Sequence, residues 1–251
     1  MSKPKVGIFG LTGCAGDQLV IINCEAELLD LVELIDIKSF IMAASAFDDV
    51  CELDVAFVEG AVVTEWDERT LHHIRERSGL LIALGTCAAF GGVAAAHTGA
   101  DWRQMLQTVY GETLPEYQSS GARALHELVK VDAVITGCPI EKHEFLAAVA
   151  NLLKGQLPVF AHYPVCAECK MHENECLLVT RAMFCCGPVT AAGCNARCPA
   201  LGVACIGCRG PAVDANYPSA IELYLEKGYA GRDVTTRLGM FAPPMLTGAN
   251  L

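Results

Sequence analysis

Cysteine is the residue that most constrains this chain: fourteen of its 251 residues are cysteine, and nine of these lie in residues 161–251. The N-terminus leads by residue 6 into a strand-like run and leaves no room for a signal peptide, so we expect a cytoplasmic protein. In that compartment thiols stay reduced, and closely spaced reduced thiols are typical metal ligands rather than disulfide partners. The sequence therefore predicts a metal-binding protein.

Composition and charge exclude several classes of protein. Hydrophobic residues make up 53% of the chain and charged residues 19%, which excludes intrinsic disorder. The formal net charge of −11 argues against a nucleic-acid partner, because phosphate backbones attract the opposite sign. No apolar run reaches the roughly 18 residues that a membrane span requires, so we expect no membrane insertion.

The change in cysteine density marks a boundary near residues 157–160 and predicts two domains, residues 1–160 and residues 161–251. In the first, short apolar runs alternate with longer amphipathic ones, which is typical of a parallel sheet covered by helices. We therefore expect an α/β fold with a flavodoxin-like, doubly wound parallel-sheet domain. The expected strands are 6–9, 39–43, 55–58, 80–84 and 133–135. The expected helices are 17–34, 65–77, 102–110, 121–129 and 141–153.

The second domain has a different character. Glycine, proline and cysteine interrupt residues 185–211, and the one clear helix is expected near 220–227. A segment with so few core elements needs inorganic centres to hold it together, as small metal domains do. We expect a loop-rich domain organised around metal.

Three cysteines of the first domain follow predicted strands. Cys14 follows the first strand, Cys87 the fourth and Cys138 the fifth, while Glu59 ends the third. Because the carboxyl ends of parallel strands line one edge of an open sheet, we expect these residues to converge there. Three thiolates and a carboxylate are one cysteine short of the usual [4Fe–4S] ligand set, and a single zinc ion would accept the same donors.

Eight cysteines of the second domain form two further sets. Their C-x2-C pairs are chelates that iron–sulfur clusters and zinc ribbons share, but three zinc sites beside a flavodoxin-like domain would be unusual. The pattern therefore favours an iron–sulfur, electron-transfer domain. Cys186 directly follows Cys185, so the spacing leaves open which of the two is a ligand. Cys24 and Cys51 belong to neither set and are expected to be buried in the core. The two sets are Cys166-x2-Cys169-x6-Cys176-x8-Cys185 and Cys194-x3-Cys198-x6-Cys205-x2-Cys208.

At these residues the sequence resembles the small, electron-transferring subunit of [NiFe]-hydrogenases. The likeness is to the cytosolic F420-non-reducing (heterodisulfide-reductase-linked) and F420-reducing group, and it covers nearly the whole chain. The motifs that carry it are Leu11-Thr12-Gly13-Cys14, Val58-Glu59-Gly60, Gly85-Thr86-Cys87, Gly137-Cys138-Pro139, Cys186-Gly187-Pro188-Val189-Thr190 and Cys205-Ile206-Gly207-Cys208.

The resemblance implies three [4Fe–4S] clusters. In membrane-bound relatives a histidine stands at the position of Cys166, and relatives with proline at the position of Cys198 hold a three-iron cluster, so a four-iron cluster is implied here. The implied ligands are Cys14, Cys87 and Cys138 for the proximal cluster, Cys194, Cys198, Cys205 and Cys208 for the medial one, and Cys166, Cys169, Cys176 and Cys185 for the distal one.

One position departs from the family pattern. The family usually has Cys-x-x-Cys after the first strand, but here the second cysteine is replaced by Asp17. Asp17 could bind the fourth iron through a carboxylate oxygen, Glu59 could bind it instead, or Asp17 could be only a helix cap. An oxygen donor should shift the potential of the proximal cluster.

The resemblance also implies a role and partners. A large subunit would split hydrogen at its nickel–iron site, and this chain would relay single electrons from proximal to medial to distal cluster, with no catalytic residue of its own. The downstream partner would be a [2Fe–2S] protein of a heterodisulfide reductase complex or a flavoprotein. The face around Cys14 and Cys87 should be apolar where the large subunit contacts it. The alternatives are a hydrogen-sensing subunit, a complex I-like iron–sulfur subunit and a zinc-binding interaction module.

Overall fold

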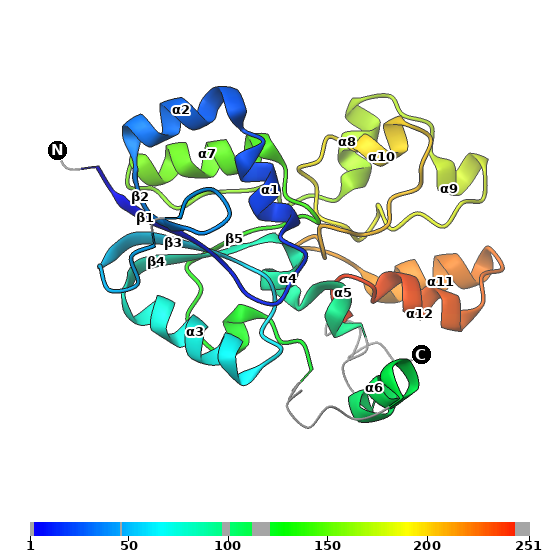
Figure 1. The fold of residues 1–251 in the computed structure, drawn as a ribbon. Coiled ribbons are helices and arrows are strands. Elements are labelled where there is room, and N and C mark those ends of the chain that lie inside the picture. The colour runs from blue at the N-terminus through cyan, green and yellow to red at the C-terminus, as the bar shows by residue number, and fades with distance from the viewer. Residues whose placement is uncertain (1–2, 46, 97–100, 112–120, 244–251) are drawn as a thin grey trace.

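The first part of the chain forms a parallel sheet. The computed structural model describes residues 3–45, 47–96, 101–111 and 121–243. Its five strands are all parallel and lie in the order β2-β1-β3-β4-β5, which is the flavodoxin-like order, so the predicted fold class is confirmed (Figure 1). The strands are β1 (Lys5–Gly10), β2 (Asp36–Phe40), β3 (Leu53–Glu59), β4 (Ser78–Leu84) and β5 (Ala133–Ile135).

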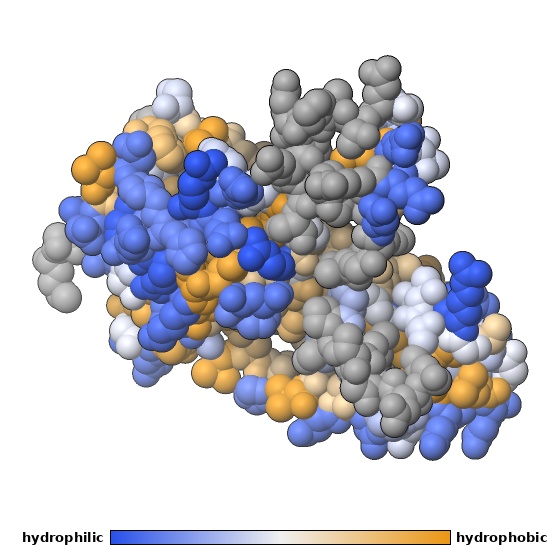
Figure 2. Space-filling view, turned by 90° about the horizontal axis from the view of Figure 1, so that it is seen from below, coloured by the Kyte–Doolittle hydropathy of each residue, from blue (hydrophilic) through white to orange (hydrophobic). Residues whose placement is uncertain are grey.

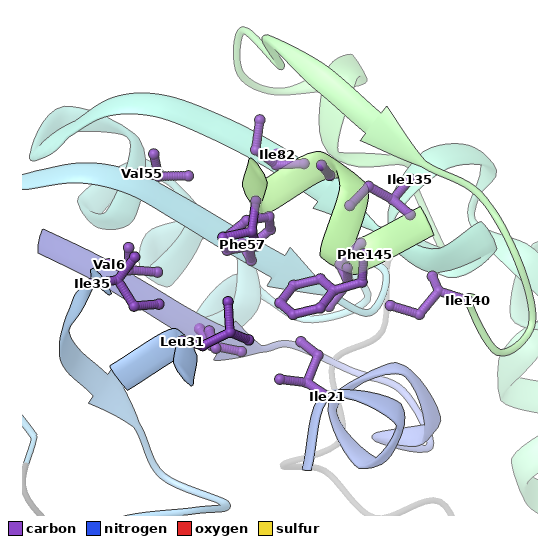
Figure 3. Close-up of a cluster of buried hydrophobic side chains, with 14 of the residues drawn as sticks. Val6, Ile21, Leu31, Ile35, Val55, Phe57, Ile82, Ile135, Ile140 and Phe145 are labelled. Atoms are coloured by element: carbon purple, nitrogen blue, oxygen red, sulfur yellow. The ribbon is translucent and has the colours of Figure 1, made fainter. Parts of the chain in front are cut away.

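Helices cover both faces of the sheet. The helices α1 (Gly16–Ile22), α2 (Glu25–Leu34) and α7 (Lys142–Leu153) lie on one face, and α3 (Glu65–Glu76) lies on the other (Figure 1). Side chains alternate along β3, so Phe57 packs on the α7 side while Val58 packs on the α3 side. The Phe57 ring meets that of Phe145 edge to face, with the ring centroids 5.4 Å apart (Figure 3).

The sequence of α3 defines both its start and its outer face. Thr64 and Asp67 form a reciprocal capping box, in which Asp67 N–H donates to Thr64 Oγ1 at 3.1 Å and Thr64 N–H donates to Asp67 Oδ2 at 2.9 Å. Leu71 and Ile74 enter the core beneath the helix. Seen from below the view of Figure 1, hydrophilic and hydrophobic residues are mixed on the surface (Figure 2).

The second part of the chain is built from short helices and loops around its own core. In this core the Phe184 ring stacks on Tyr224 with centroids 4.2 Å apart, and Cys185, Cys186 and Cys205 are buried beside them. The helices of this part are α8 (Val165–Met171), α9 (Leu177–Thr180), α10 (Arg197–Ala200), α11 (Tyr217–Glu226) and α12 (Gly231–Leu238).

Two predicted helices differ from the structure. The predicted helix 17–34 is interrupted, because the chain turns at Asn23 and Cys24 and α2 starts a new axis. The predicted helix 121–129 is reduced to a short 3-10 turn, Leu125–Glu127. Its first residues instead pair with the segment after β3, because Arg123 and Val62 exchange both backbone hydrogen bonds at 2.9 and 3.0 Å.

Other elements lie close to their predicted positions. The helix α6 (Trp102–Tyr110) agrees with the prediction, and α11 extends the one expected near 220–227. The predicted strand 39–43 begins and ends three residues earlier, as β2. Cys24 is fully buried as expected, whereas Cys51 is only half-buried against the core on the α3 side. Among the described residues, no helix combines the length and apolar character needed to cross a bilayer.

Candidate iron–sulfur sites

The register of the sheet brings the predicted site residues of the first domain to one edge. Gly10 of β1 lies opposite Glu59 of β3, and Glu59 lies opposite Leu84 of β4, so these strands end level with one another. The loops that carry Cys14, Cys87 and Cys138 leave from this edge. Cys87 lies in α4 (Gly85–Phe90), which starts directly at the end of β4.

Four donors gather at this edge. Burial raises the pKa of the Cys87 thiol to about 11, and the nearby Asp17 carboxylate and Cys14 add to the rise. Cys138 is exposed, but partial desolvation of its thiol still raises the pKa to about 11, with Cys87 and Asp17 as the next contributors. These mutual interactions place Cys14, Asp17, Cys87 and Cys138 in one group. Cys14 and Cys138 are exposed, so this group opens onto the surface.

Glu59 supplies the cap of α1. The helix follows Ala15, which has a left-handed backbone and no capping side chain. Both carboxylate oxygens of the buried Glu59 accept backbone hydrogen bonds, from Asp17 N–H at 3.1 Å and from Gln18 N–H at 3.0 Å. Both oxygens of Glu59 are therefore engaged in capping the helix.

Asp17 ties together the loops of the site. Its Oδ1 accepts a hydrogen bond from Ile140 N–H at 2.8 Å, just beyond Cys138. Its Oδ2 lies against the backbone of Gly85, where an added Cβ would be only 1.8 Å from that oxygen. Burial and then the charge of Glu59 raise the pKa of Asp17 to about 7, against the effect of the Ile140 N–H. Asp17 therefore does not cap its own helix, and Oδ2 has no hydrogen-bond donor among the described residues.

The first cysteine set of the second domain also gathers. Cys166 and Cys169 lie on α8, and Cys176 immediately precedes α9. Burial raises the pKa of Cys166 to about 11, followed by the effects of Cys185, Cys169 and Cys176. The backbone of Gly187 packs against this group. A Cβ at Gly187 would lie 3.3 Å from Cys166 Sγ and 3.5 Å from Cys185 Sγ.

The second set is less uniformly arranged. Burial raises the pKa of Cys208 to about 11, and the neighbouring Cys194 and Cys198 contribute to the rise. Cys205 instead lies beside Cys185, whose sulfur accepts a hydrogen bond from Cys205 N–H at 3.3 Å. Cys205 is therefore positioned at the boundary between the two sets.

Comparisons with known proteins place the chain in a family. The model of the family described as NADH ubiquinone oxidoreductase, 20 Kd subunit, matches residues 14–152, which is more than half of the chain. Sulfhydrogenase 2 subunit delta of Pyrococcus furiosus is 40% identical over 238 residues, covering 95% of this chain and 99% of that protein. The chain belongs to the hydrogenase small-subunit branch of this family.

Further matches agree with this membership. A subunit of the F420-non-reducing hydrogenase vhu from Methanocaldococcus jannaschii is 31% identical, covering 82% of this chain and 81% of its own length. An actinobacterial-type NiFe-hydrogenase structure from Ralstonia eutropha H16 shares the fold, with a TM-score of 0.60 at 16% identity over 100% of this chain and 94% of that chain. The resemblance to hydrogenase small subunits, an iron–sulfur family of oxidoreductase subunits, is therefore confirmed.

The neighbours of Cys185 and Cys186 differ, which bears on the ligand that spacing left open. Cys185 interacts with Cys166 and Cys169, whereas Cys186 interacts with Cys185 and Cys208 and lies beside Gly207, where a Cβ would be 3.8 Å from its sulfur. Burial raises the pKa of Cys186 to about 12, so an unbound Cys186 stays a neutral thiol at physiological pH.

We therefore expect Cys185→Ser to remove one cluster, about four irons per chain, while Cys186→Ser keeps the wild-type iron content. Iron and acid-labile sulfide analysis of the two purified variants measures this difference. An iron loss confined to Cys186→Ser would reverse the assignment.

A single-ion site is not preformed in the described part of the chain. No three His, Cys, Asp or Glu side chains there are close enough to hold one metal ion. Tetrahedral zinc would require its sulfurs to lie about 3.8 Å apart.

Sequence reasoning missed three buried charged residues beside the cysteines. Glu168 lies within the Cys166-x-x-Cys169 pair, and Arg209 follows Cys208 directly and pairs with Glu144 of α7 at 2.7 Å. Their signal in the sequence is weak, because charged residues also occur next to cysteines on exposed surfaces. Only their burial distinguishes them.

Proposed function

We propose that this hydrogenase subunit is an electron relay with three [4Fe–4S] clusters, which passes electrons from hydrogen oxidation on a large subunit to a downstream redox subunit. When bound, such clusters accept and release one electron at a time. The proposed ligands are Cys14, Asp17, Cys87 and Cys138 for the proximal cluster, Cys194, Cys198, Cys205 and Cys208 for the medial one, and Cys166, Cys169, Cys176 and Cys185 for the distal one.

The position of Cys208 is the observation that carries this proposal. Its backbone carbonyl accepts a hydrogen bond from Thr86 Oγ1 at 2.6 Å, and Thr86 precedes the proximal residue Cys87. Its sulfur also lies close enough to the backbone N–H of Cys138, a second proximal residue, for that group to lower the pKa of the Cys208 thiol. One medial residue thus contacts two proximal loops, which supports a short route between the two sets.

A second contact extends this route toward the distal set. Cys205 N–H donates to Cys185 Sγ at 3.3 Å, so a medial residue and a distal residue touch directly. These two contacts support the proposed order of the relay, from the proximal to the medial to the distal set. The proposed domains, residues 1–160 and 161–251, meet at the proximal–medial contact.

The donors fit an iron–sulfur cluster. Several thiols lie together in each set, and partial burial together with the neighbouring negative charges raises their pKa values, as at Cys87, Cys166 and Cys208. Thiolates so arranged are unfavourable unless positive charge is bound between them. Iron supplies that charge, and soft thiolate donors are the ligands that iron–sulfur clusters use.

Asp17 is the proposed fourth ligand of the proximal cluster. Its Oδ1 is held by Ile140 N–H, while Oδ2 lies against the backbone of Gly85, two residues before Cys87, and has no donor among the described residues. A carboxylate that is fixed at one oxygen presents the other in a defined direction. This arrangement supports iron binding through Oδ2.

The proposed partners follow from the exposure of the sites. The proximal group opens to the surface at Cys14 and Cys138, and the apolar side chains of Leu19 and Val93 nearby are 46% and 48% exposed. We assign this face to the large subunit of a [NiFe]-hydrogenase. The distal group is exposed at Cys176, where a [2Fe–2S] protein of a heterodisulfide reductase complex or a flavoprotein would receive the electrons. We propose that the complex is cytoplasmic.

Metal analysis of the anaerobically purified complex tests this function. We expect about twelve irons and twelve sulfides per chain, and no zinc. We also expect Asp17→Cys to change one EPR signal of the reduced complex and to leave the other two unaltered, because only the proximal cluster exchanges an oxygen ligand for sulfur.

Other results would contradict the proposal. Two zinc ions without sulfide would indicate an interaction module, and eight irons would mean that the site at the sheet edge holds no cluster. An unaltered proximal signal in Asp17→Cys would show that Asp17 is not a ligand. Asp132→Asn, a change remote from all three sites, is the matched control for the loss of a carboxylate.

A further inference from the structure

A buried carboxylate connects the distal motif to the medial one. Glu168 lies on α8 between Cys166 and Cys169 and is 5% exposed. Its Oε1 accepts a hydrogen bond from Gly193 N–H at 2.7 Å, and its Oε2 accepts one from Ala196 N–H at 2.9 Å. Oε2 also lies 3.9 Å from the sulfur of Cys194. A negative charge from one motif is therefore held beside a cysteine of the next.

A buried cation lies beside the same cysteine. Arg209 is 2% exposed, and its Nε donates to Ala192 O at 2.9 Å while its Nη2 donates to Glu144 Oε1 at 2.7 Å. The pair packs onto the backbone of Gly193, where a Cβ would lie 2.1 Å from Glu144 Oε1 and 2.4 Å from Arg209 Nη2. Gly193 adopts a φ of +121°, which favours glycine.

The arginine also has an unused donor. Its Nη1 is buried and has no acceptor among the described residues. A buried N–H without a partner is costly, so such groups are normally hydrogen-bonded. Arg209 acts electrostatically on both Cys194 and Cys208, and a cluster sulfur held between these two cysteines would supply an acceptor.

Glu168 and Arg209 act on Cys194 in opposite directions. Burial is the main cause of the raised pKa of Cys194, and the negative charge of Glu168 adds to it. The positive charge of Arg209 lowers the same pKa. Both charged groups are buried, so water screens them little and their effects are larger than those of surface charges.

The same two charges act on a reducible centre. Reduction adds one negative charge, which a nearby cation stabilises and a nearby anion destabilises. Charge and hydrogen bonds to the sulfurs are the means by which a protein adjusts the potential of an iron–sulfur cluster. The charges therefore bear directly on how readily the medial centre accepts an electron.

We propose that Glu168 and Arg209 are positioning residues that together determine the reduction potential of the medial cluster, with Glu168 lowering it and Arg209 raising it. This inference rests on the proposed function, because it requires a cluster at Cys194. It assigns no ligand role to either residue.

Redox titration of the whole complex, followed by the EPR signal of each cluster, tests the inference. Glu168→Gln keeps the shape and an acceptor but removes the charge, so we expect the medial potential to rise. The shift should correspond to at least a tenfold change in the reduction equilibrium constant, about 59 mV for a one-electron couple. Glu68→Gln, which removes a carboxylate paired with Arg123 in the first domain, should move no signal.

Variants of Arg209 test the expected shift in the opposite direction. Removing it alone would leave Glu144 buried without its partner, so Arg209→Met is measured in the Glu144→Gln background and compared with Glu144→Gln alone. We expect the medial potential to fall by a shift of the same order. Arg209→Lys, which retains the positive charge, should keep the potential close to that of the parent.

Three outcomes would overturn the inference. The medial potential could be unchanged in both the Glu168 and the Arg209 variants at full iron content, or it could move in the same direction in both. Alternatively, both variants could lose the medial irons, which would indicate a purely structural role. The wild-type measurement separates these results from failure of the proposed function. A wild-type complex that lacks iron or a medial signal would overturn the relay itself.

Discussion

Gly85→Ala is expected to disrupt the proximal site and remove about four irons per chain. The new Cβ would lie 1.8 Å from Asp17 Oδ2, and Gly85 has a φ of +81°, which costs an alanine roughly 1–2 kcal/mol. Either Asp17 must leave Ile140 N–H unpaired, or α4 must move and carry Cys87 with it. Iron analysis and the apparent Tm of the anaerobic complex measure the effect, and we expect both to fall.

A double-mutant cycle identifies the cause. Because Asp17→Ala removes the atoms that the new Cβ would strike, Gly85→Ala should cost less Tm in the Asp17→Ala background than in the wild type. The part that remains is the backbone cost at Gly85. Equal costs in the two backgrounds would show that the contact with Asp17 is unimportant.

Cys208→Ser is expected to have the largest effect on electron transfer. It removes a proposed medial ligand at the point where Thr86 and Cys138 contact the second domain. We expect the medial EPR signal to disappear while the other two remain. Hydrogen-dependent reduction of the downstream acceptor should fall by more than about 100-fold, since even outer partners of metal ligands commonly contribute 10–100-fold.

Cys51→Ser is the matched control, because Cys51 lies outside all three sets and is half-buried against the core on the α3 side. It should retain all irons and the wild-type rate. Acceptor reduction at an undiminished rate by Cys208→Ser, despite loss of the medial signal, would mean that electrons bypass the medial cluster.

The sequence alone was sufficient for the fold class and for most of the proposed donors. The apolar periodicity of each strand is local information that the sequence contains. Because parallel strands end at one edge of a sheet, the sequence also predicted that Cys14, Cys87 and Cys138 lie near one another. Close cysteine spacing likewise indicated the two sets of the second domain. Local pattern was misleading at 121–129, where helix-like residues pair with a distant backbone at Val62 instead.

Only the tertiary structure decided the surroundings of these donors. Glu59 caps a helix 42 residues away, Glu168 reaches Ala196 28 residues away, and Arg209 pairs with Glu144 65 residues away. Such partners are determined by how the sheet edge and the cysteine-rich domain pack, and no periodicity along the chain records that packing. The sequence therefore determined which residues could bind metal, while the fold determined which charges lie beside them, because burial and pairing across long separations arise only when the whole chain is packed.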